Sequence, residues 1–258
     1  METYTLITGA SSGIGLEIAS QLAAQQKPLI LVARSGDKLR TIAAELATKH
    51  QCPVQIIMAD LANPDQFWNV FSTVKERGLE VSTLINNAGV GCYGDFDVIN
   101  LQQQLDMLSL NIQALVALTH LFLPDMRERN AGHILNIGSL LSFFPFPYFS
   151  AYAASKAFVL SFSEALGAEL SDTNIKVTVY CPGQTESAFA STKMLTTKAY
   201  KDMKMASASH VAAGAIKAMT AGRATVIHGF MNNFLVFITR FNPRAIHVKI
   251  MKGMASQI

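Results

Sequence analysis

The chain of 258 residues is half hydrophobic and only 15% charged, which excludes a disordered protein. Its net charge of +3 is too small for a nucleic-acid binder, so no nucleic-acid partner is expected. Cys52, Cys92 and Cys181 are widely spaced, so we expect no metal site and no disulfide framework, and a reducing, cytoplasmic location. The first residues show no signal-peptide pattern, and no apolar run reaches the ~18 residues of a membrane span.

Short apolar runs alternate with longer amphipathic segments along the whole chain. The predicted strands are 4–8, 28–33, 54–58, 82–86, 133–138, 175–181 and 225–228. The predicted helices are 14–26, 36–50, 64–77, 99–129, 151–171, 208–221 and 230–252. Continuous apolar strands separated by helices indicate a parallel sheet covered on both faces. We therefore predict an α/β fold in which residues 1–258 form one doubly wound, Rossmann-type domain of about seven strands.

A glycine-rich turn, Thr8–Gly15 (TGASSGIG), follows the first predicted strand and opens a helix. Glycines let the backbone approach a phosphate, and the helix N-terminus offers free N–H groups to the anion. The spacing GxxxGxG differs from GxGxxG, and an ordinary strand-to-helix turn is the alternative. Its place after the first strand favours a nucleotide site.

The second predicted strand ends in Val32-Ala33-Arg34-Ser35, with no acidic residue before Asp37. An NAD site usually has a carboxylate here, whereas a guanidinium suits the 2′-phosphate of NADP. We predict NADP(H) as the cofactor, with Arg34 as its phosphate ligand rather than a solvated loop charge.

Three polar residues form a candidate catalytic set. Ser139 follows a predicted strand, and Tyr152 and Lys156 share one face of a predicted helix at positions i and i+4. An ammonium near a phenol lowers the phenol pKa from ~10 toward neutrality, as proton transfer requires. A serine hydroxyl beside them would bind the substrate oxygen.

Together with Asn86-Asn87-Ala88-Gly89, Asn111 and Pro182-Gly183, these motifs occur in the order typical of one family. The chain resembles the short-chain dehydrogenase/reductase family over nearly its whole length, in the NADP-preferring oxidoreductase branch. The resemblance implies that Tyr152 is the general acid/base, and that Lys156 lowers the pKa of Tyr152 and holds the nicotinamide ribose. It also implies that Ser139 orients the carbonyl and that Asn111 supports a proton-relay water.

The same resemblance implies a set of cofactor contacts. They are Gly9, Ser11, Ser12, Gly13, Ile14, Gly15, Arg34, Ser35, Asp60, Leu61, Asn87, Ala88, Gly89, Tyr152, Lys156, Pro182, Gly183 and Thr185. Structural alternatives remain for three of the polar residues: Asn87 as a strand-end anchor, Asn111 as a packing amide, and Asp60 as the cap of the next helix. Relatives commonly form dimers or tetramers on long helices, here 99–129 and 151–171.

Two segments bear on the substrate. The aromatic residues of LLSFFPFPYFSA, between Ser139 and Tyr152, form an apolar wall of the substrate site or pack a loop or an interface. Residues 184–206 lie where the family has a substrate-covering segment. These features predict an NADP(H)-dependent oxidoreductase acting on a carbonyl or alcohol. A 3-oxoacyl-thioester reductase and a non-catalytic NADP-binding regulator are the alternatives.

The C-terminal tail, 229–258, is unlike the rest of the chain. Residues 203–258 hold seven basic and no acidic residues. Phe230, Phe234, Phe237 and Phe241 fall on one helix face, and basic residues (Arg240, Arg244, Lys249 and Lys252) surround Pro243. We expect this helix to pack on its own subunit or a neighbour. The alternative is a basic amphipathic surface that contacts an anionic membrane or the acidic groups of a thioester-bound acyl substrate.

Overall fold

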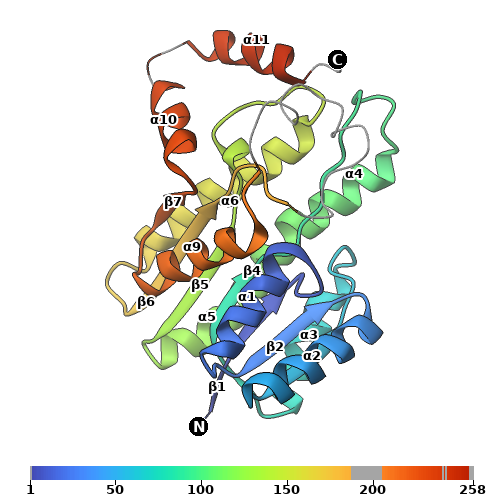
Figure 1. Ribbon diagram of the computed structural model, residues 1–258, viewed down its shortest axis with the longest axis vertical. Coiled ribbons are helices and arrows are strands. Elements are labelled where there is room, and N and C mark those ends of the chain that lie inside the picture. Colours follow the sequence, from blue (N-terminus) through green and yellow to red (C-terminus); the bar gives the residue numbers. More distant parts are fainter. Residues whose placement is uncertain (1, 187–204, 240, 242, 256–258) are drawn as a thin grey trace.

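The computed structural model describes residues 2–186, 205–239, 241 and 243–255. Its centre is a seven-stranded parallel sheet in the order β3-β2-β1-β4-β5-β6-β7 (Figure 1). The strands are β1 Thr3–Thr8, β2 Leu29–Ala33, β3 Val54–Met58, β4 Glu80–Asn86, β5 Gly132–Ile137, β6 Ile175–Cys181 and β7 Thr225–Ile227. The predicted doubly wound single domain is therefore confirmed.

Helices lie between successive strands in the described part of the chain, and two more, α10 and α11, follow the last strand. They are α1 Gly13–Ala24, α2 Gly36–His50, α3 Asp65–Glu76, α4 Leu101–Leu108, α5 Ala114–Glu128, α6 Ser150–Glu169, α9 Ala208–Thr220, α10 Phe230–Thr239 and α11 Arg244–Ala255. A π-helical turn, Ser109–Gln113, joins α4 to α5, and a 3-10 turn, Leu140–Ser142, follows β5.

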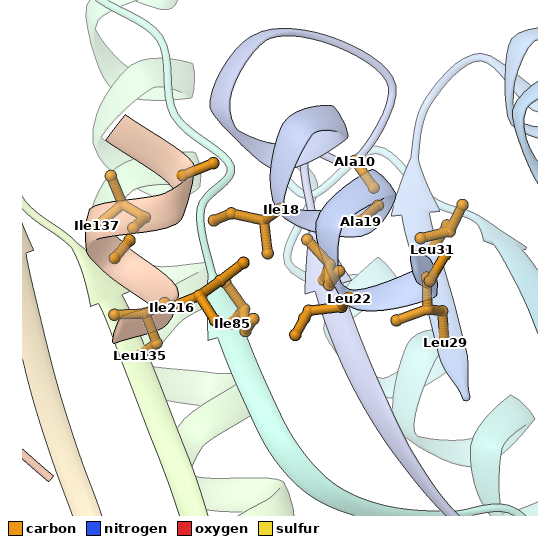
Figure 2. Packing of buried hydrophobic residues seen from close by; sticks show 14 of the residues in the cluster. Ala10, Ile18, Ala19, Leu22, Leu29, Leu31, Ile85, Leu135, Ile137 and Ile216 are labelled. Atoms are coloured by element: carbon orange, nitrogen blue, oxygen red, sulfur yellow. The ribbon is translucent and has the colours of Figure 1, made fainter. Parts of the chain in front are cut away.

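Two hydrophobic layers sandwich the sheet, which explains the continuous apolar character of the strands. On one face, side chains of α1, α2 and α9 pack on alternate strand residues, as Figure 2 shows for Ile18, Leu22 and Ile216 against Leu31, Ile85 and Leu135. On the other face, α3, α5 and α6 cover the remaining strand residues. Strand side chains alternate between the two layers.

The helical stretch Leu101–Glu128 is long and apolar enough to cross a membrane by length and composition alone. Half of its most apolar window is buried within the fold, and Leu118, Phe122 and Met126 belong to the core beneath the sheet. These contacts are typical of a core helix.

The predicted single helix 230–252 is wrong. The structure has two helices there, α10 and α11, which are separated at Pro243. Proline lacks an N–H group and clashes with the preceding turn, so it starts a new helix more readily than it continues one. Of the basic residues of the tail, Arg240 and the side chain of Arg244 lie outside the described part of the structure.

The strand order reverses between β1 and β4, because the chain runs outward from β1 to β3 and returns to the other side of β1. In such sheets, ligands bind beyond the carboxyl ends of the strands at this reversal. The glycine turn, Asn87 and Ser139 all follow strands at that edge.

Candidate active site

The glycine turn between β1 and α1 has the backbone that a phosphate cradle requires. Gly9 and Gly13 have φ values of +64° and +55°, and a Cβ on Gly9 would lie 2.9 Å from the Cα of Ala88. No described side chain caps the first turn of α1, and that turn holds no acidic residue. Its N–H groups and the positive end of its dipole are therefore available to an anion.

Asn87 fastens the loop after β4 to the glycine turn. Its Nδ2 donates to the carbonyls of Thr8 and Gly9 at 2.9 and 3.3 Å, while the Thr8 hydroxyl oxygen accepts from the N–H groups of Asn87 and Ala88. Gly15 lies next to these hydrogen bonds, and a Cβ on Gly15 would be 2.4 Å from the Asn87 Nδ2. The Asn87 side chain thus has the anchoring role that the sequence left open, while the residue also lines the cavity.

Arg34 and Ser35 follow β2 and line the same cavity. Arg34 is exposed, and within the described residues it has no ion pair, whereas Arg40 pairs with Asp37. Asp60 also lines the cavity, and its carboxylate accepts the N–H of Ala62 at 3.2 Å. The alternative role of Asp60 as the cap of α3 is wrong, because α3 begins at Asp65 after Pro64.

Ser139, Tyr152 and Lys156 all line this cavity, which has a volume of about 670 Å³. Tyr152 and Lys156 lie one turn apart on α6, and the Lys156 Nζ is 5.9 Å from the centroid of the Tyr152 ring. Nζ donates to the Ile137 carbonyl at the end of β5, at 2.9 Å. The amine is therefore held between the phenol and the floor of the cavity.

Burial of Lys156 lowers its pKa from 10.5 to about 8. The low-dielectric surroundings disfavour the ammonium, and no described carboxylate pairs with it. At neutral pH the group is still mostly protonated, so a cation stands beside Tyr152. That cation favours the phenolate form of a neighbouring tyrosine.

The Ser139 hydroxyl is positioned by the 3-10 turn that follows it. Its Oγ accepts the N–H of Leu141 at 3.1 Å, and its own N–H donates to the Ser142 Oγ. Ser142 in turn donates to the Lys156 carbonyl at 2.8 Å, which joins the turn to α6. Accepting from Leu141 leaves the Ser139 hydroxyl hydrogen for donation into the cavity.

Asn111 lies in the π-helical turn and does not line the cavity itself. Its Nδ2 donates to the Val90 carbonyl and to the Ser155 Oγ, and its Oδ1 accepts the Val90 N–H. The amide therefore fixes the loop at Gly89, whose Cβ position would be 3.1 Å from Oδ1 and 3.4 Å from the Lys156 Nζ. Asn111 therefore has the packing role, and its role in supporting a proton-relay water stays a prediction.

Of the predicted cofactor residues, all but Gly15 line the cavity. Besides those already described, they are Ser11, Ser12, Ile14, Leu61, Pro182, Gly183 and Thr185. Residues 187–204 of the predicted covering segment lie outside the described structure. Its two described ends meet, because Thr185 pairs with Ala206, and the Glu186 N–H donates to the Ala206 carbonyl at 2.9 Å.

The far half of the cavity is apolar. The aromatic loop contributes Phe144, Phe146 and Phe149, so part of the predicted wall lines the cavity; Phe143 packs beside it instead. Among the lining residues that the sequence did not predict are Tyr93, Leu235, Met251 and Met254. They come from a loop and from the tail helices, and nothing in their local sequence indicates that they meet here.

The described residues fit a bound dinucleotide on structural grounds alone. The glycine turn, with two residues at positive φ, and the open N-terminus of α1 suit a pyrophosphate, and Arg34 suits an additional phosphate. The buried amine of Lys156 also lines the cavity, beside its apolar half. One continuous cavity connects these groups, so a cofactor and a substrate can bind side by side.

A family model described as "short chain dehydrogenase" matches residues 3–198. The chain belongs to the short-chain dehydrogenase family. Curated relatives in this family include a very-long-chain 3-oxoacyl-CoA reductase of Anas platyrhynchos, 36% identical over 69% of this chain and 58% of the relative. A 17-beta-hydroxysteroid dehydrogenase type 3 of Mus musculus is 35% identical over 70% of this chain and 60% of the relative.

This short-chain dehydrogenase thus spans about three fifths of the length of those two relatives. Among solved structures, a short-chain dehydrogenase from Sphingobium yanoikuyae in complex with NADPH has a TM-score of 0.82 and 28% sequence identity, and the match covers 93% of both chains. The predicted family is confirmed.

Proposed function

We propose that this short-chain dehydrogenase is an NADP(H)-dependent oxidoreductase that interconverts a carbonyl group and a secondary alcohol on an apolar substrate. The observation that carries the proposal is the single cavity that joins the glycine turn and Arg34 at one end to Ser139, Tyr152 and Lys156 at the other. This cavity allows a dinucleotide to extend from α1 to α6.

Bound NADPH supplies a hydride for the carbonyl carbon. In that direction, the Ser139 hydroxyl donates a hydrogen bond to the carbonyl oxygen and stabilises the developing negative charge. Tyr152 donates its phenolic proton to the same oxygen, so the product is an alcohol and the tyrosine is left as phenolate. The ammonium of Lys156 stabilises that phenolate, and in the reverse direction Tyr152 accepts the proton.

The preference for NADP(H) rests on Arg34. Its exposed guanidinium lines the cavity beyond β2, and the carboxylate of Asp37 is occupied by Arg40. A planar guanidinium forms charge-assisted, bidentate hydrogen bonds with a phosphate. The related structure from Sphingobium yanoikuyae contains NADPH, which is consistent with this choice.

An apolar substrate is supported by the wall of aromatic, leucine and methionine side chains in the far half of the cavity. The names of the two curated relatives point to 3-oxoacyl thioesters and to steroids, carbonyl compounds with a long acyl chain or a fused ring system that is apolar. A 3-oxoacyl-thioester reductase is therefore the second candidate function. A regulator that binds NADP without turnover is the candidate of a different class.

The deciding experiment follows NADPH oxidation by the purified protein with simple ketones, aldehydes, ketosteroids and 3-oxoacyl thioesters. We expect turnover with at least one apolar carbonyl compound, and a loss of at least about 10³-fold in kcat for Tyr152→Phe with NADPH binding retained. NADPH binding without turnover in any class would favour the regulator. Turnover that survives in Tyr152→Phe would refute the catalytic assignment.

We also propose a cytoplasmic homo-oligomer assembled on the long helices α5 and α6. Trp68, beside α5, and Phe158, on α6, are exposed apolar side chains, 64% and 40% exposed. Burying them against a second copy would remove apolar surface from water. Sedimentation equilibrium tests this, and a monomer at micromolar concentration would refute it.

A further inference from the structure

The outward face of α10 is an aromatic surface that nothing in the described structure covers. Phe230, Phe234 and Phe237 are 86%, 50% and 55% exposed, and Met231 is 70% exposed. The periodicity predicted from sequence is therefore real. Of the two expected packing partners, the chain's own subunit is wrong for this face, and a neighbouring subunit stays a prediction. The helix packs through Val236 instead, which is 5% exposed.

Helix α11 also carries exposed apolar side chains. Ile246, Val248 and Ile250 are between 41% and 53% exposed, and Phe241, between the two helices, is 73% exposed. Figure 1 shows both helices at the end of the molecule opposite the N-terminus. We call the exposed apolar residues of α10, Phe241 and α11 the tail surface. The rings of Phe237 and Phe241 are in contact, with centroids 5.1 Å apart. A group of exposed apolar side chains of this kind marks an interaction site.

The opposite side of the same two helices belongs to the cavity. Leu235 of α10 and Met251 and Met254 of α11 line it, and Val236 and Met251 pack on Leu140 and Phe144 beside Ser139. One side of α10 and α11 thus forms the tail surface, and the other side lines the apolar half of the cavity.

The charge of the tail favours an anionic partner. No acidic residue occurs after Asp202, and Lys249 and Lys252 are exposed on α11 next to Ile250. Short helices with aromatic and aliphatic side chains on one face and lysines at its border bind in the headgroup region of anionic bilayers.

We propose that the tail surface docks on an anionic lipid bilayer, with α10 and α11 lying in the headgroup region. If the proposed function also holds, an apolar substrate enters the cavity from the bilayer past Leu235 and Met254. The docking step itself does not depend on the reaction.

A second copy of the chain is the competing occupant. Pairing of the tail surface with itself about a two-fold axis would bring like-charged lysines together, which disfavours that arrangement. The loop before α4 offers another receptor, with exposed Phe96 and Val98 beside Asp95 and Asp97. The experiment must therefore separate lipid binding from self-association.

The test is flotation of the full-length protein with vesicles of phosphatidylcholine alone and vesicles that also contain phosphatidylglycerol, at low and high salt. We expect binding to the anionic vesicles that weakens with salt. Phe234→Ser/Phe237→Ser and Lys249→Glu/Lys252→Glu should each reduce the bound fraction at least about tenfold. Matched controls are Phe96→Ser and Lys217→Glu, at exposed positions outside the tail.

NADPH binding and the thermal midpoint of each variant show that it is folded, because none of the substituted residues lines the cavity. Absence of binding to anionic vesicles overturns the proposal. So does a wild-type dimer that the Phe234→Ser/Phe237→Ser variant dissociates, since the tail surface would then be a protein interface. Vesicle binding without turnover of any carbonyl compound would leave docking intact and refute only the proposed function.

Discussion

The ring of Phe149 stacks on the ring of Tyr152, with centroids 4.3 Å apart and planes inclined by 19°. The ring of Tyr93 makes a T-shaped contact with Phe149, with centroids 5.9 Å apart. Tyr148, which precedes Phe149, has a φ of +61°, and its carbonyl accepts the Gly94 N–H. This left-handed turn directs Phe149 against the candidate acid/base, so the stack holds the phenol in place and excludes water from one of its faces.

We predict that Phe149→Leu lowers kcat about tenfold while the KM for NADPH stays unchanged. A stacked aromatic pair contributes ~0.5–1.5 kcal/mol beyond its buried area, and that contribution here goes to the position of Tyr152. A loss confined to thermal stability would mean that Phe149 is only a packing residue.

The matched control is Phe71→Leu. Phe71, on α3, also packs on a neighbouring ring, that of Phe122, with centroids 5.4 Å apart, but it does not line the cavity. Its replacement should leave kcat unchanged.

Arg34→Asp should change cofactor selectivity. A carboxylate at the end of β2 repels a 2′-phosphate but accepts a hydrogen bond from a ribose hydroxyl. We expect kcat/KM for NADPH to fall at least about tenfold (~1.4 kcal/mol), with kcat/KM for NADH unchanged or higher. Arg40→Ala removes a neighbouring exposed guanidinium, which pairs with Asp37, and should change neither value. Equal losses with both cofactors would assign Arg34 a structural role.

The sequence predicted the sheet to within about two residues per strand, because buried parallel strands are unbroken apolar runs. All but one of the predicted cofactor residues line the cavity, because most of them follow strands at one edge of the sheet. The sequence did not distinguish a residue that binds a cofactor from one that holds the loop in place. The side-chain amide of Asn87 donates hydrogen bonds to the carbonyls of Thr8 and Gly9, and this becomes visible only in the folded loop.

The substrate side was much less accessible to sequence reasoning. Tyr93, Leu235 and Met254 meet only through tertiary packing, and the Tyr93 hydroxyl donates to the Ala255 carbonyl at the end of α11. The spacing of the tail phenylalanines correctly predicted a shared face. Periodicity does not say whether such a face points inward, and here the smaller side chains of α10 face the core.

Replacement of Lys156 should make the fold more stable at neutral pH while it abolishes turnover. Burial lowers the pKa of Lys156 to about 8, against 10.5 for a free lysine, so below pH 8 the folded state carries the full penalty of a buried ammonium. That penalty, roughly 3 kcal/mol, disappears as the pH rises from 8 to 10.5, and the group's contribution to the free energy of unfolding therefore increases over this range.

Lys156→Met removes both the penalty and its pH dependence. We expect its free energy of unfolding at pH 7 to exceed that of the wild type by about 1–3 kcal/mol, a gap that closes toward pH 10.5. Denaturant unfolding of both proteins from pH 7 to 10.5 measures this gap. Cys181, whose pKa burial raises to about 12, contributes to both proteins and largely cancels in the difference. A variant less stable than the wild type at pH 7 would contradict the prediction.

Gly183→Ala should expose a link between the tail and the cofactor site. A Cβ on Gly183, in the loop after β6, would lie 2.6 Å from the Asn232 Nδ2 of α10, which donates to the His228 carbonyl at 2.7 Å. We expect Gly183→Ala to lose about 1–3 kcal/mol of stability and to bind NADPH more weakly, because the loop must move away from α10.

The second substitution Asn232→Ala removes the obstructing amide, so the double variant should recover NADPH affinity and show a favourable coupling energy of about 1 kcal/mol or more. Gly167→Ala on α6 is the control, since its Cβ would make an ordinary contact, 3.7 Å from Val177, and should stabilise the helix by ~0.5–1 kcal/mol. Additive losses in the double variant would mean that the loop is displaced by something other than Asn232. Recovery would mean that α10, whose outer face forms the tail surface, also sets the position of a loop that lines the cofactor cavity.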